Sequence, residues 1–194
     1  MKIHLAILTL FGIICISPIV KAQQKDSYLV LTSEDTLYGK IKTDVSGRVK
    51  LKVVDGGGTI KYKQDELIGY YDARKDMVFI TINPEDDNHG PWLYERKADG
   101  IIKLYSYIFE EVNGGRVPFY YVERENSGPR RILKGSVVSI KKEKDVLREF
   151  MYDNEDILSE IKRTGWNEKN VLRLINWYNS WYITEKNHNK TDQD

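Results

Sequence analysis

The chain has 194 residues, of which 41% are hydrophobic and 11% aromatic, with 30 basic residues, 29 acidic residues and one cysteine. The balanced charge argues against a nucleic-acid binder, which needs a basic excess, and the apolar content argues against a disordered chain. One cysteine can form neither an internal disulfide nor a cysteine-based zinc site.

Residues 1–22 have the pattern of a secretory signal peptide. Lys2 gives a positive start, an apolar run covers residues 5–16, and Val20 and Ala22 occupy positions −3 and −1 of a cleavage site. The alternative is an uncleaved membrane anchor, but the run is short against the ~20 residues that a span needs. We therefore expect Sec-dependent export to the periplasm, the outer membrane or the medium, and a mature chain without a transmembrane span.

Cleavage after Ala22 would change the composition of the chain. The mature part, 23–194, has 28 basic and 29 acidic residues and no cysteine, because Cys15 leaves with the signal. The charges are also balanced within 23–140, at 18 against 18, and within 141–194, at 10 against 11. Neither part has the asymmetry that nucleic acid or an anionic lipid surface requires, so we expect no nucleic-acid partner.

The segment 23–140 is predicted to be a β-rich domain. Apolar and polar residues alternate with period two in the short runs 37–42, 49–54 and 60–63, and lysines take many of the polar positions. Gly-rich turns at 55–58, 113–115 and 127–129 separate the runs, as in antiparallel hairpins. Further strands are expected at residues 28–31, 67–73, 77–82, 92–96, 101–109, 119–124 and 136–140.

The hydrophobic period changes to three and four residues after residue 140, which predicts a helical segment over 141–186 and a polar tail over 187–194. Asp153 is expected to cap one helix, Gly165 to close it, and Asn167 to cap a helix that runs from about 168 to 184. The predicted fold is α+β: an antiparallel β-rich roll, barrel or sandwich, followed by a C-terminal pair or trio of helices packed on it.

One family resemblance comes from the start of the mature chain. The runs YLVL at 28–31 and DTLYGKI at 35–41 resemble the loose YIVxxxxDTIxGxI start of a family of exported β-rich proteins of Bacteroidota. The runs KY at 61–62, ELIGY at 66–70 and WYN at 177–179 are also similar to that family. No function is attached to the family, so the resemblance implies a place in the cell envelope or outside the cell and no particular chemistry.

Few residues suggest catalysis. The mature chain has two histidines, His89 and His188, and it lacks both a Gly-x-Ser-x-Gly elbow and a phosphate-binding Gly-rich loop. Glu123 and Glu125 share one face of a predicted strand, about 7 Å apart, where a charged surface is the usual reason for such a pair. We expect no enzyme activity, and a secreted carboxylate-dependent hydrolase is the alternative.

The densest oxygen cluster lies in a predicted loop, at Glu85, Asp86, Asp87 and Asn88. Ca²⁺ takes six to eight oxygen ligands, so this loop is the candidate metal site. It lacks the every-second-residue spacing of an EF-hand, and a solvated acidic turn is the favoured interpretation. We therefore expect no cofactor, with Ca²⁺ as the open alternative.

Aromatic residues on the last predicted helix are the candidate binding site: Trp177, Tyr178, Trp181 and Tyr182. Such rings either pack in the core or form a contact surface, and the core is favoured. The predicted function is that of an exported, non-catalytic envelope or secreted protein that binds a protein or glycan partner through a β face or this helix. A structural or accessory subunit that pairs an edge strand with a larger envelope assembly is the other alternative.

Overall fold

The computed structural model describes residues 26–44, 48–53, 57–84, 91–110, 114–125, 127–134 and 140–191. The strands are β1 Tyr28–Leu31, β2 Thr36–Thr43, β3 Val49–Val53, β4 Thr59–Tyr62, β5 Leu67–Asp72, β6 Met77–Ile82, β7 Trp92–Ala98, β8 Ile102–Glu110, β9 Arg116–Arg124 and β10 Arg130–Lys134. The helices are the short η1 Gln64–Glu66, then α1 Ile140–Phe150, α2 Glu155–Arg163 and α3 Glu168–Thr191.

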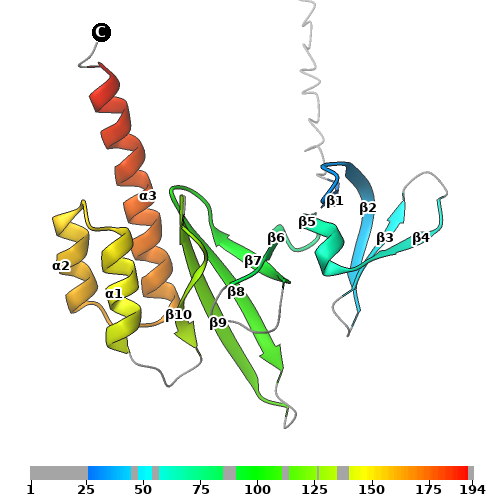
Figure 1. Ribbon diagram of the computed structural model, residues 1–194, viewed down its shortest axis with the longest axis horizontal. Coiled ribbons are helices and arrows are strands. Elements are labelled where there is room, and N and C mark those ends of the chain that lie inside the picture. The colour runs from blue at the N-terminus through cyan, green and yellow to red at the C-terminus, as the bar shows by residue number, and fades with distance from the viewer. Residues whose placement is uncertain are drawn as a thin grey trace, which may run out of the picture.

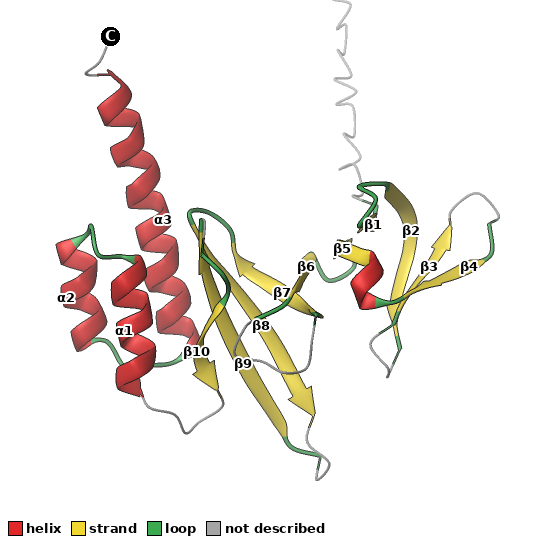
Figure 2. Cartoon of the chain, in the orientation of Figure 1, coloured by secondary structure: helices red, strands yellow, loops and turns green. Residues whose placement is uncertain are grey.

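All ten strands belong to one open antiparallel sheet in the order β10-β9-β8-β7-β6-β5-β1-β2-β3-β4 (Figure 1). Because β1 lies between β5 and β2, the chain builds the sheet outward in both directions from its first strand. Strands β10 and β4 are the two edges. The three α-helices follow the ten strands in the chain, as the blue-to-red colouring of Figure 1 shows. Figure 2 distinguishes these helices from the strands of the sheet, and the predicted α+β class is confirmed.

The helices cover one face of the sheet at the β8–β10 end, where α1 contacts β10 and α3 contacts β7 and β8 (Figure 1). Side chains from β8–β10 and the three helices form one buried cluster there, which includes Ile102, Leu104, Leu147, Ile161 and Leu174. None of the helices in the described part of the chain is long and apolar enough to cross a membrane.

The other end of the sheet, β1–β5, has its own core of Leu29, Ile41, Val49, Leu51, Leu67 and Tyr70. Strand β2 follows the predicted alternation closely, since Gly39 and Ile41 are buried while Lys40 and Lys42 are exposed. The apolar face of β2–β4 packs on the rest of this end, and the lysine face is left to solvent.

Asn179 on α3 joins the helices to the sheet. Its side-chain oxygen accepts a hydrogen bond from the Ile102 amide at 2.9 Å, and its amide nitrogen donates to the Ile102 carbonyl at 2.8 Å. Gly100 lies against this side chain with φ at +154°, and a Cβ at this position would come within 2.6 Å of the Asn179 amide. Only glycine allows so close an approach in this backbone conformation.

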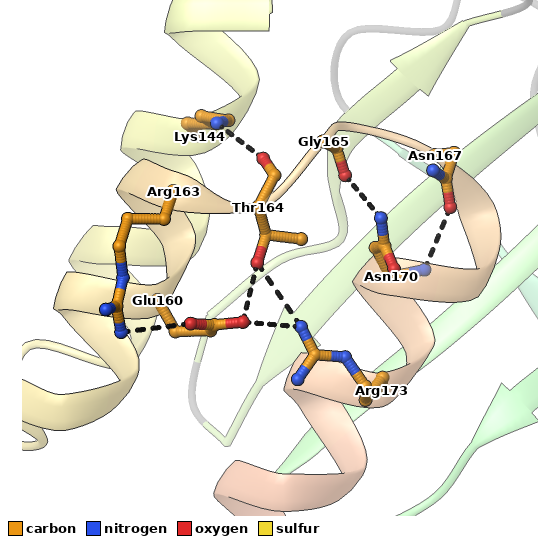
Figure 3. Close-up of polar contacts among 8 residues, drawn as sticks. All are labelled: Lys144, Glu160, Arg163, Thr164, Gly165, Asn167, Asn170 and Arg173. Carbon is orange, nitrogen blue, oxygen red and sulfur yellow. Dashed lines mark hydrogen bonds and ion pairs between the residues drawn. The ribbon is translucent and has the colours of Figure 1, made fainter.

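A network of polar contacts joins the three helices where α2 ends and α3 begins (Figure 3). Glu160 accepts hydrogen bonds from Arg173 at 2.7 Å and from the Thr164 hydroxyl at 2.8 Å, and these bonds lower the pKa of its carboxyl group. Lys144 of α1 donates to the Thr164 carbonyl at 2.8 Å. Asn170 of α3 donates to the Gly165 carbonyl at 2.8 Å, so these groups act as a structural junction.

The structure corrects several of the predicted elements and their ends. Residues 130–134 form strand β10, which the hydrophobic pattern did not predict. Ile140, predicted to end a strand, is the first residue of α1. The rest of that predicted strand, residues 136–139, lies outside the described part of the chain. The N-cap of α2 is Asn154 rather than Asp153, because the Asn154 side chain accepts the Ile157 amide at 2.9 Å. Helix α3 continues to Thr191, into the predicted tail, because no proline or glycine stops it.

Two predicted caps have different outcomes. Asn167 does cap α3, since its side chain accepts the Asn170 amide at 3.0 Å. Gly165 directly follows the C-cap residue Thr164, but it does not adopt the positive φ that a glycine at this position commonly provides.

Candidate functional site

The four aromatic residues predicted on the last helix fall into two groups. Tyr178 is fully buried, and Trp181 and Tyr182 are partly buried against the same core cluster. The ring centroids of Tyr178 and Trp181 lie 5.5 Å apart, and those of Tyr178 and Tyr182 lie 6.1 Å apart. Trp177 is 41% exposed. Three of the four rings therefore pack on the fold, and only Trp177 faces solvent to a large extent.

Polar contacts hold Tyr178 in place. Its hydroxyl donates a hydrogen bond to Asp153 at 2.7 Å, and the Arg124 guanidinium lies over its ring. Burial, together with the Asp153 hydrogen bond, raises the pKa of Tyr178 well above its usual value. Arg124 also donates to the Phe150 carbonyl, and its guanidinium lies over the ring of the exposed Tyr152. These contacts anchor α3 to the turn after α1, which is a structural role.

The carboxylates considered for catalysis do not converge. Glu123 accepts the Tyr105 hydroxyl at 2.7 Å, and Glu125 lies beyond the end of β9. The acidic loop of Glu85, Asp86, Asp87 and Asn88 lies outside the described residues. Within the part of the chain that the structure describes, no group of three or more histidine, cysteine, aspartate or glutamate side chains is placed to hold a metal ion.

The buried carboxyl groups have structural partners. Asp72 is 4% exposed and forms an ion pair with Arg74 at 3.1 Å, while Arg74 also donates to the Ile41 carbonyl. Glu143 is 5% exposed and accepts the indole N–H of Trp166 at 2.7 Å. Burial raises the pKa of Glu143, and the Trp166 hydrogen bond opposes this rise. These groups stabilise the fold and form no acid–base pair.

A different site emerges at the other end of the sheet. Strands β2, β3 and β4 contain five lysines and no acidic residue. Strand register places all five on one face, which we call the basic face: Lys40, Lys42, Lys50, Lys52 and Lys61. The remaining positions of these three strands on the same face are Thr36, Tyr38 and Thr59.

The lysines of the basic face stand directly opposite one another. Lys42 pairs with Lys50 and Lys50 with Lys61, which makes a row of three across the strands, and Lys40 pairs with Lys52. Directly opposed residues have Cβ atoms about 4.5–5.5 Å apart, so like charges at these positions are destabilising. The one acidic partner that the described residues give this group is Asp44, 3.4 Å from the Lys50 ammonium.

A row of tyrosines continues this face toward the middle of the sheet. Tyr38 pairs with Tyr28, and Tyr28 pairs with Tyr71, across β2, β1 and β5. Their ring centroids lie 6.0 Å and 5.6 Å apart. Tyr38 is 57% exposed, whereas Tyr71 is buried and donates its hydroxyl to Asp76 at 2.7 Å. An exposed aromatic ring thus lies next to the lysines on one continuous surface.

The sequence contains a signal for this site, although the charges of the whole segment 23–140 are balanced. Residues 36–63 contain seven basic and two acidic residues, a local excess of five positive charges within a part that is balanced overall. The alternation of the strands then predicts that the lysines share faces strand by strand. The register, which aligns the three strands, is visible only in the fold.

Comparisons of the chain with protein-family models, with curated proteins and with solved structures found no match.

Proposed function

We propose that this chain is an exported, non-catalytic binding protein whose basic face binds an acidic ligand in the cell envelope or outside the cell. The pattern of residues 1–22 supports export. The observation that carries the binding role is the alignment of five lysines on one face of β2–β4.

The cost of this arrangement supports a role in binding. Each directly opposed pair of like charges in a sheet costs about 0.2–1 kcal/mol, and the basic face contains three such pairs. Threonine or another uncharged residue would be more stable at the same positions. Features that lower stability without a structural benefit are typical of functional surfaces. An acidic ligand would remove the repulsion, because it places negative charge between the ammonium groups.

The spacing of the lysines suits a ligand with several negative charges. Side chains two residues apart on one strand lie about 6.7 Å apart, and those on neighbouring strands lie closer. Five ammonium groups therefore form a small lattice with two rows. A ligand with repeated acidic groups can contact several of them at once, which raises the affinity beyond that of a single ion pair.

The same lysines argue against the role of an accessory subunit that pairs its edge strand with another chain. Strand β4 is an edge of the sheet, and Lys61 lies at its centre. Lysine on an edge strand hinders pairing with a further strand, because pairing would crowd or desolvate the charge. The surface is better suited to contact an anionic partner through its face than through its edge.

Binding is tested by removing the row of three lysines. We expect the purified protein to bind dextran sulfate, and the variant Lys42→Gln/Lys50→Gln/Lys61→Gln to bind about 100-fold more weakly, at about 1 kcal/mol per lysine near an anionic surface. The matched control is Lys141→Gln/Lys142→Gln/Lys169→Gln, which removes the same charge from exposed positions on α1 and α3. Equal losses in both variants would mean non-specific attraction and would contradict the proposal.

Export is tested separately. The protein recovered from the envelope or medium of cells that express the full chain should have the mass of residues 23–194. Recovery of the intact chain from the cytoplasm would contradict export and leave the binding result unaffected.

A further inference from the structure

We infer that the ligand of the basic face is an acidic polysaccharide, with one sugar ring stacked on Tyr38 and its acidic groups in contact with the lysines. This inference rests on the proposed function and adds the chemical class of the ligand. It depends on an aromatic ring that a site for bare anions would not need.

Tyr38 lies on the same face of β2 as Lys40 and Lys42, since residues two apart on a strand point the same way. It is therefore about 6.7 Å from the first lysine along the strand. Its side chain is 57% exposed, which leaves one side of the ring open to solvent. A pyranose ring that contacts this side would place its substituents over the lysines.

The ring of Tyr38 has an aromatic neighbour on the same face of the sheet. Its neighbour across the strands is Tyr28, whose ring centroid lies 6.0 Å away at an angle of 55°. Tyr28 in turn contacts Tyr71, which is buried and hydrogen-bonded to Asp76. A ring held by such a row loses little freedom when a ligand binds, and preorganisation of this kind raises affinity.

The composition of the face distinguishes a sugar from a lipid surface. On this face, β2, β3 and β4 carry five lysines, two threonines and Tyr38, with no aliphatic side chain. A membrane-binding surface usually adds apolar side chains that enter the acyl boundary. Threonine hydroxyls at Thr36 and Thr59 instead offer hydrogen bonds of the kind that sugar hydroxyls accept and donate.

The tyrosine row also distinguishes a sugar from a single-stranded nucleic acid. Successive bases need successive exposed aromatic platforms. Here Tyr38 is the exposed ring, while Tyr71 is 8% exposed and Tyr28 is half-buried between them. One open ring beside a lattice of ammonium groups suits one sugar ring flanked by acidic groups.

The experiment compares acidic polysaccharides with polyanions that contain no sugar. The probes are polygalacturonate, which carries carboxylates, dextran sulfate, which carries sulfates, inorganic polyphosphate and an oligothymidylate. We expect Tyr38→Leu to weaken binding of at least one of the two polysaccharides by about threefold to tenfold, which corresponds to the loss of one aromatic contact. Its affinity for polyphosphate should not change. Tyr38→Phe should behave as the original protein does.

The matched control is Tyr152→Leu, which removes another exposed tyrosine, in the turn between α1 and α2, and should leave binding unchanged. Thermal melting checks that each variant folds. An equal effect of Tyr38→Leu on polyphosphate and on both polysaccharides, or no effect on either, would overturn the inference. Tighter binding of the oligothymidylate, with the same dependence on Tyr38, would overturn it in favour of nucleic acid.

The two proposals fail in different ways. If the triple lysine variant binds every probe as well as the original protein does, the basic face is not the site and the proposed function fails. If that variant loses binding but Tyr38→Leu does not discriminate between the probes, the basic face binds anions and only the polysaccharide assignment fails.

Discussion

The two ends of this single sheet differ in how many of their faces are buried. At the helical end, consecutive residues of β8 and β9 are buried, because the helices cover one face and a cluster of aromatic rings fills the other. At the β2–β4 end, the middle of β2 alternates, with Gly39 and Ile41 buried and residues 38, 40 and 42 exposed. A sheet that is covered on both sides has no face left for a ligand. The end without α-helices keeps one face in water, and that face holds the lysines.

The largest expected effect tests the helical end. Tyr178 of α3 is fully buried and contacts Arg124 and Asp153, so Tyr178→Ala should lower the free energy of unfolding by about 3–5 kcal/mol, as measured by urea titration. The neighbouring Trp177 is 41% exposed, and Trp177→Ala should cost about 1 kcal/mol. Equal losses at the two positions would mean that both sides of α3 are core.

A pair of glycine substitutions compares the two ends directly. Gly100→Ala should lower stability by about 2 kcal/mol, because a Cβ here would displace Asn179 and strain a backbone at positive φ. Gly58, next to β4, has nothing within 4 Å of its Cβ position and no positive φ. Gly58→Ala should raise stability by about 0.4–1 kcal/mol through the unfolded chain. Thermal unfolding of both variants measures this difference in stability. A rise in the stability of Gly100→Ala would contradict the close contact between Gly100 and Asn179 of α3.

The smallest expected effect concerns the lysines themselves. Lys52→Thr removes the repulsion with Lys40 and introduces a residue that favours strands, so stability should rise by about 0.2–1 kcal/mol at low salt. The gain should shrink at 1 M salt, where the screening length falls to about 3 Å. Lys103→Thr is the matched control on β8, because Lys103 stands opposite Glu123 and its loss should lower stability instead. If the gain in stability does not depend on salt, strand propensity alone would explain it.

The missed strand shows where alternation ceases to be a guide. Strand β10 has only two apolar residues, Ile132 and Leu133, between basic residues, and a bulge shifts its register with β9 between Arg131 and Leu133. The pattern therefore looked like a polar connection. The strand predicted at residues 136–140 instead ends at Ile140, which begins α1. At a sheet edge covered by a helix, packing decides the strand more than its own sequence does.

The candidate site was also only partly predictable. Aromatic spacing correctly placed Tyr178, Trp181 and Tyr182 on one helix, and their burial agrees with the interpretation of these rings as core. The spacing could not distinguish Trp177, because its exposure depends on which side of the helix packs against the core. The lysines were visible as the polar half of three alternating runs, yet each run by itself is an ordinary solvated strand.

The sequence by itself determined which residues form most strands, which side of each strand is polar, and the order of sheet and helices, because these depend on local periodicity. Only the tertiary structure decided that β1 lies between β5 and β2, that the helices cover one end, and that Lys42, Lys50 and Lys61 form a row. The reason is physical: charge repulsion and ligand contact depend on distances across strands, and those distances are set by register and pairing. A chain whose charges nearly cancel thereby acquires one strongly basic face.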